Sequence, residues 1–149
     1  MNRIELLCQE LQKTWHNKIP LSDAMGLKLD SFGNNVLTTR ASLAPNINVH
    51  GTAFAGSLYS AQALTGWGML WLQLKLLGID ASIVLASGQI EYLKPLGEAL
   101  ITSCDFAAHV DSMDVLIEMG RARFKLECTI TGKNGLASQF SGDYAVMLS

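Results

Sequence analysis

A short run of polar and small residues is the part of this chain best suited to chemistry. Asn46, Asn48 and His50 lie in a polar loop that leads directly into the small residues of 51–57. Small residues let a ligand approach backbone N–H groups closely, and the N-terminus of a helix favours negative charge. We therefore predict a site where this loop meets a helix. From residue type alone, Asn48 is more readily explained as a turn or helix-cap asparagine that bonds nearby backbone.

The segment that follows predicts the element that positions this site. No charged residue occurs from Gly51 to Leu74, and apolar residues cover almost every side of the segment. Such a helix must be enclosed by protein or by lipid. Gln62, Thr65 and Gln73 interrupt the run, and neither flank carries a Lys/Arg cluster, which favours a buried core helix over a membrane span. We expect this helix to cover 55–78.

The rest of the chain supplies elements that could enclose it. Asn2 and Glu5 resemble the start of an N-terminal helix whose apolar face continues to about His16, and Pro20 is expected to stop it. Alternating residues and turn signals predict strands at 25–32, 36–43, 83–93, 99–110, 121–130 and 136–146, with a polar break at 111–114. The fold class predicted is α+β, an antiparallel sheet of five or six strands wrapped round one long helix.

Composition limits the classes of function. The 149 residues predict one domain, 1–149, that is 49% hydrophobic and only 16% charged, so further surface is expected to be covered in a homodimer or higher homo-oligomer. The net charge of −2 argues against a nucleic-acid partner. Three widely separated cysteines without metal-ligand spacing predict reduced thiols, no metal site and a cytoplasmic location. No signal peptide is recognisable.

The loop motif resembles that of hot-dog fold thioesterases, which carry an asparagine and then Gly-Thr-x-His-Gly-Gly before the central helix. Matching positions are Asn48, Gly51, Thr52 and Gly56, whereas Phe54 replaces the histidine and Ala55 the middle glycine.

A closer likeness is to the stand-alone hot-dog branch of malonyl-acyl-carrier-protein decarboxylases, often labelled thioesterases and also found fused behind an acetyltransferase domain. The strings that carry it are 45–48, 54–57 and 64–68. This resemblance implies acetyl-acyl carrier protein as product, to prime fatty acid synthesis, with acyl carrier protein or coenzyme A as the partner and no other cofactor.

The acidic residues of the region bear on the choice of reaction. Hot-dog thioesterases usually supply a carboxylate on or before the central helix, and their motif would place it near Ala63, yet no Asp or Glu occurs from Ser31 through Ile79. Decarboxylation needs no general base, but it needs donors that stabilise an enolate oxygen. The missing acid therefore favours decarboxylation over hydrolysis. A thioesterase and a non-catalytic acyl-binding or dimerisation module remain as alternatives.

The resemblance carries the family's functional asparagine over to Asn48, and the chemistry of the reaction suggests roles for the other candidates. Asn48 is expected to orient the malonyl carboxylate or polarise the thioester carbonyl, and His50 to bind the carboxylate or donate a proton. The backbone N–H groups of Ala55 and Gly56 would form the oxyanion hole. The remaining substrate-binding candidates are Asn46, Thr65, Arg121 and Arg123. Each has a structural alternative, namely loop shaping for Asn46, backbone satisfaction for Thr65, and an ordinary solvated strand face for the two arginines. A lone loop histidine such as His50 is at least as often structural.

Overall fold

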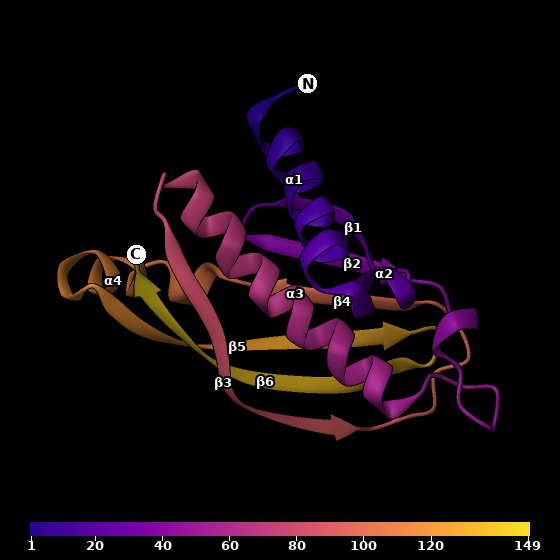
Figure 1. Cartoon of the computed structure of the whole chain (residues 1–149). Coiled ribbons are helices and arrows are strands. Elements are labelled where there is room, and N and C mark those ends of the chain that lie inside the picture. The colour runs from indigo at the N-terminus through magenta and orange to yellow at the C-terminus, as the bar shows by residue number, and fades with distance from the viewer.

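Helix α3 (Ala55–Leu76) lies across one face of a six-stranded antiparallel sheet in the computed structural model, which describes residues 1–149 (Figure 1). The strands are β1 (Lys28–Gly33), β2 (Val36–Ala41), β3 (Ala81–Tyr92), β4 (Leu100–Asp105), β5 (Arg121–Gly132) and β6 (Gly135–Leu148). The other helices are α1 (Arg3–Lys18), α2 (Pro20–Ala24) and α4 (Ser112–Met119), with 3-10 turns at Ala44–Asn46 and Ala107–His109. The strands pair in the order β1-β2-β4-β5-β6-β3, which leaves β1 and β3 as edges.

The predicted central helix is confirmed, and its glycines explain how it is covered on two sides. At Gly66 an added methyl would meet the hydroxyl of Tyr144 on β6, and at Gly68 it would meet the indole of Trp15 on α1. The sheet and α1 therefore approach α3 on different faces, which is why the sequence shows no polar face. No helix in the structure is long and apolar enough to span a lipid bilayer.

The alternation predicted for β5 is also confirmed. Phe124, Leu126, Cys128 and Ile130 are buried against the helix layer, whereas Arg123, Lys125 and Glu127 are exposed on the opposite face. Cys128 lies directly opposite Cys104 of β4, and both are free thiols in the core. The sheet thus has one apolar and one polar face, as a single-layer antiparallel sheet covered on one side requires.

Two predicted boundaries were wrong. The stop expected at Pro20 is confirmed, because α1 ends at Lys18, and Pro20 itself occupies the first position of the short helix α2, where its missing N–H costs nothing. The strand expected at 99–110 ends at Asp105, and the break expected at 111–114 is the start of α4. Aspartate and serine are common in turns and at helix N-termini alike, so the polar pair before Met113 did not distinguish the two.

The arrangement as a whole confirms the expected fold class, a hot-dog architecture in which an antiparallel sheet packs round one long helix. The N-terminus of α3 lies at one end of this sheet and α4 at the other (Figure 1). The loop from 42 to 54 extends past the N-terminal end of the helix, so the predicted site falls at the end of the molecule remote from α4.

Substitution of Gly66 by alanine tests the close packing of α3 on the sheet. Alanine favours a helix over glycine by about 1 kcal/mol, but a methyl group here must displace the buried Tyr144 side chain, whose hydroxyl donates a hydrogen bond to Ala63 O. We expect Gly66→Ala to lower the free energy of unfolding by about 1–2 kcal/mol in urea denaturation. Gly97→Ala, at an exposed glycine with open space around it, is the matched control and should change little. Equal stability of both variants would contradict the packing described.

Candidate functional site

The loop before α3 is closed on itself by backbone hydrogen bonds. Phe54 N donates to Asn46 O at 2.7 Å, Asn48 N to Thr52 O at 2.8 Å, and Ile47 pairs with Ala53 in an isolated antiparallel bridge. A second attachment comes from outside the loop, because Ala53 N donates to Leu96 O at 2.7 Å. These bonds hold the loop in one position relative to the start of α3.

Asn46 anchors this loop to the body of the protein. Its side chain is buried at 2% exposure, and Nδ2 donates to the carbonyl oxygens of Met25 and Ser42, both at 2.8 Å. Its own carbonyl accepts from the backbone N–H of Phe54, which directly precedes α3, and its Oδ1 has no hydrogen-bond partner in the chain. Asn46 is therefore placed to shape the loop, and it does not line the cleft described below.

Asn48 is half-buried at the inner side of the loop. Its Oδ1 accepts hydrogen bonds from His50 N at 2.9 Å and Thr52 N at 3.2 Å, which is an asparagine-stabilised turn. Its Nδ2 donates to Thr52 Oγ1 at 3.0 Å and, at 3.4 Å, to Ala53 O. The last contact is near the long limit of a hydrogen bond, so this N–H is the one that a substrate oxygen could take over.

The N-terminus of α3 is uncapped. Phe54 offers no side-chain acceptor, and the N–H groups of Ala55, Gly56 and Ser57 form no hydrogen bond within the chain. These three donors carry the positive end of the dipole of a 22-residue helix. The Phe54 ring lies so close to Gly56 that a methyl group there would force the half-exposed ring to move.

A cleft of about 370 Å³ opens beside these groups, between the loop and the segment that follows β3. Asn48, His50 and Ala55 line it, together with Leu58, Tyr92 and other residues of 92–96. None of its eleven lining residues carries a carboxylate, and the two that can carry positive charge are His50 and Lys94. The cleft is therefore suited to an anionic ligand.

Four of the predicted site residues come together and four do not. Asn48, His50 and Ala55 line the cleft, and Gly56 adjoins it in the first turn of α3. Asn46 is buried behind the loop, as described above. Thr65 lies inside the core, where its hydroxyl donates to Ala61 O at 2.6 Å and contacts the Thr39 hydroxyl at 2.7 Å.

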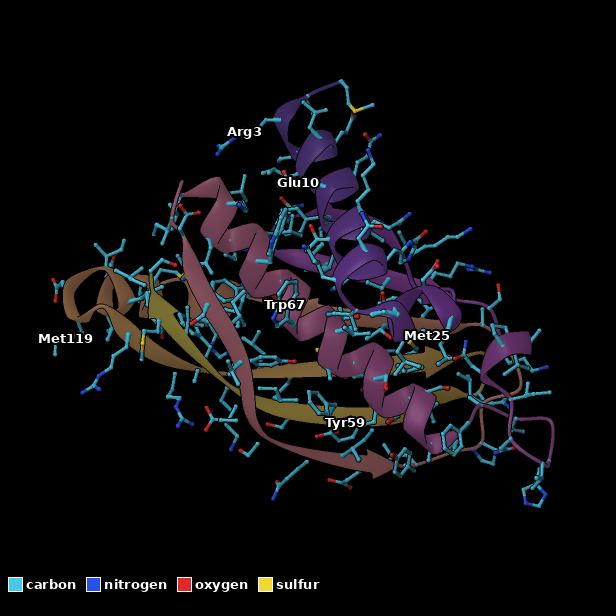
Figure 2. All side chains as sticks on the ribbon, in the orientation of Figure 1. Arg3, Glu10, Met25, Tyr59, Trp67 and Met119 are labelled. Carbon is cyan, nitrogen blue, oxygen red and sulfur yellow. The ribbon has the colours of Figure 1, made fainter.

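Arg121 and Arg123 lie at the opposite end of the sheet, on the face turned away from α3. Arg121 pairs with Met147 and so shares a row with Ser82, ten residues along β3 from Tyr92. Figure 2 places Met119, two residues before Arg121, far from the first turns of α3, where Tyr59 is labelled. Arg123 also forms an ion pair with Asp143 at 2.7 Å. Within one chain, neither arginine contributes to the cleft. The prediction failed because alternation along a strand shows which face of the sheet a residue occupies but not which end.

Tyr92 is a site residue that sequence reasoning missed. It ends β3, its side chain lines the cleft, and its hydroxyl donates to Ala55 O at 3.0 Å. Burial, and in second place the neighbouring Tyr59, raise the pKa of Tyr92, so it is a protonated donor at neutral pH. The sequence did contain an indication of this role. Tyr92 lies two residues after Ile90, so both side chains point to the helix side of a strand that was expected to end just before Pro95.

Comparison with known proteins shows the family to which this chain belongs. A family model described as "Putative thioesterase (yiiD_Cterm)" matches residues 8–148. The chain belongs to this family. Its structure is similar to that of a putative thioesterase from Shewanella oneidensis, with 40% identity, a TM-score of 0.89 and coverage of 97% of this chain and 99% of that one.

Two further solved structures extend the comparison. A protein of unknown function from Chlorobaculum tepidum is 27% identical, with a TM-score of 0.91 and coverage of 97% and 96%. A thioesterase from Haemophilus influenzae is only 11% identical, with a TM-score of 0.74 and coverage of 95% and 90%, and thus supports the fold alone. The expected resemblance to thioesterase-like hot-dog proteins is confirmed at the level of the family.

Removal of the Asn46 amide tests its role as the anchor of the loop. Asn46→Ala leaves the carbonyl oxygens of Met25 and Ser42 without this donor in a buried setting, at a cost of about 1–3 kcal/mol in stability. The loss should appear as a lower denaturation midpoint in urea. Asn134→Ala, at an exposed turn asparagine whose side chain forms no hydrogen bond, should be within about 0.5 kcal/mol of the parent protein. An Asn46→Ala variant as stable as this control would exclude the anchoring role.

Proposed function

We propose that this protein is an enzyme that decarboxylates malonyl held as a thioester on acyl carrier protein, giving acetyl-acyl carrier protein that can prime fatty acid synthesis. One observation carries the proposal: free helix N–H groups and an asparagine amide meet at a cleft that contains no carboxylate. The family description supports an acyl-thioester substrate but not the type of reaction.

Decarboxylation would use these groups in one step. The electrons of the bond between the methylene carbon and the carboxylate move toward the thioester carbonyl, CO₂ leaves, and an enolate oxygen carries the negative charge. Donors already oriented toward that oxygen stabilise it without reorganisation. The N–H groups of Ala55 and Gly56 and the Asn48 amide are the donors that the chain offers there. His50 and Lys94 would attract the anionic substrate.

Hydrolysis, the second candidate, requires a group that activates water. The position expected for an acid on the helix is Ala63, and Glu91, next to Tyr92, lies on the other face of the sheet beside Lys125 and Glu127. A carboxylate in the cleft would moreover repel a malonyl group. The thioesterase alternative is favoured by the name of the family and by the Shewanella oneidensis protein described above. A non-catalytic acyl-binding module is the third candidate.

We also propose that the working form is a homodimer or higher homo-oligomer. Strand β3 is twelve residues long and pairs on one side only, with β6. A long unpaired edge is a template for another strand. Ile47, Phe54 and Leu93 around the cleft are each about half exposed, and Val49 is 95% exposed, which is apolar surface that a second copy would cover.

Incubation of the pure protein with malonyl-acyl carrier protein tests the proposal. Mass spectrometry should detect acetyl-acyl carrier protein, with loss of CO₂ and retention of the thioester. Free carrier thiol would instead establish hydrolysis, and unchanged substrate would support a binding module. Malonyl-coenzyme A in a parallel reaction reports whether the carrier protein itself is needed.

Asn48→Asp separates the catalytic role of Asn48 from its role in the loop. The carboxylate can still accept from His50 N and Thr52 N, so the turn is retained, but it lacks the donor and repels the malonyl carboxylate. We expect kcat/KM for decarboxylation to fall by about 10²–10³, the usual effect of losing one oxyanion donor.

The matched control is Asn35→Asp, at the β1–β2 turn remote from the cleft. Full decarboxylase activity in Asn48→Asp would remove Asn48 from the mechanism, and a gain of hydrolysis would favour the thioesterase alternative.

A further inference from the structure

Tyr92 is joined to the same helix turn that offers the free N–H groups. Its hydroxyl donates to Ala55 O, while the N–H of Ala55 is one of the three without an acceptor. The ring lines the cleft beside Asn48 and is 49% exposed, so the phenol can contact both a bound acyl group and solvent.

A buried chain of hydrogen bonds fixes the position of Tyr92. Gln62 of α3 is fully buried, and its Nε2 donates to Ser138 Oγ at 3.0 Å. Ser138 in turn donates to the carbonyl of Glu91 at 3.0 Å and is the partner of Tyr92 in the β3–β6 register. The end of the edge strand is thereby tied to the helix, although a strand end with one neighbour would otherwise be free to move.

The other proton donors of the cleft are less well placed. The His50 ring forms no hydrogen bond and lies on the exposed side of the loop, while Lys94 Nζ donates to Asn134 O at 2.7 Å in the β5–β6 turn. The Thr52 hydroxyl is engaged with the Asn48 side chain. Only Tyr92 is bonded directly to the first turn of α3.

We propose that the Tyr92 hydroxyl is the catalytic acid that protonates the enolate, a role that rests on the decarboxylation proposed above. After CO₂ leaves, the enolate electron pair forms a new C–H bond at the former methylene carbon and the O–H bond of Tyr92 breaks. The product is the acetyl thioester, and the phenolate recovers a proton from water. The transfer is downhill, because a thioester enolate is a much stronger base than a phenolate.

Tyr92→Phe tests this assignment, with Tyr59→Phe as the matched control. The phenylalanine keeps the ring and loses only the O–H, whereas Tyr59 packs edge-on against Phe140 outside the cleft. We expect kcat for acetyl-acyl carrier protein formation to fall by about 10²-fold in Tyr92→Phe, with KM changed by less than about 2-fold. The solvent deuterium isotope effect on kcat should rise, and added imidazolium should restore part of the activity.

Two outcomes would overturn the assignment. Turnover of Tyr92→Phe within about twofold of the parent enzyme would do so, since a general acid typically contributes far more. A loss of turnover without a larger isotope effect and without rescue would show that the hydroxyl only supports the helix end. The parent enzyme tests the proposed function separately. If it forms no acetyl-acyl carrier protein, both decarboxylation and the role of Tyr92 are excluded. If the parent enzyme and Tyr92→Phe form this product equally well, only the role of Tyr92 is excluded.

Discussion

The enclosure of α3 is the constraint on which the rest of the structure depends. A helix without a polar side must be covered along its length, and here the sheet and α1 cover it, with Gly66 and Gly68 at the points of closest approach. One stripe of the helix is only half-buried, at Ser60, Ala63 and Trp67, and its first turn keeps free backbone N–H groups. At the N-terminal end, the unsatisfied N–H groups of the first turn face outward without a capping side chain. The helix therefore offers free donors at this end, which is the point where we propose that an anionic group binds.

The loop and the edge strand complete that point from two sides. Asn46 fixes the loop to the body, Asn48 folds its tip, and Tyr92 attaches the end of β3 to the first helical turn. All of these contacts use neutral groups. In a partly desolvated cleft this matters, because a carboxylate would raise the cost of placing a second negative charge nearby. The same arrangement would be poorly equipped to activate water, which is why the proposal departs from the activity in the family's name.

The sequence predicted the elements whose signals are local. The central helix follows from an uncharged segment of helical length, and the alternation of β5 follows from its own residues. The part of the site in the loop was also predictable, since Asn48, His50 and Ala55 are close in sequence and stay close in space.

The remaining features depend on tertiary placement. Alternation predicts the sheet face on which Arg121 and Arg123 lie, and this face suggested that they bind substrate. The end of the sheet at which they lie follows only from strand order and register. Tyr92 shows the same limit, because alternation places its side chain on the inward face but does not reveal that β3 ends beside the first turn of α3. Helix α4 was missed because Asp111 and Ser112 suit a turn as well as a helix start.

The most direct test of the account is to observe the three free amides of the helix N-terminus while a ligand binds. A sulfoacetyl-pantetheine amide carries a sulfonate that cannot be lost and so mimics the substrate without reacting. In ¹⁵N-labelled protein, titration with this compound should shift the amide protons of Ala55, Gly56 and Ser57 downfield together with the side-chain amide of Asn48. Saturable binding that leaves these four signals unchanged would contradict the claim that the open end of the buried helix is the site.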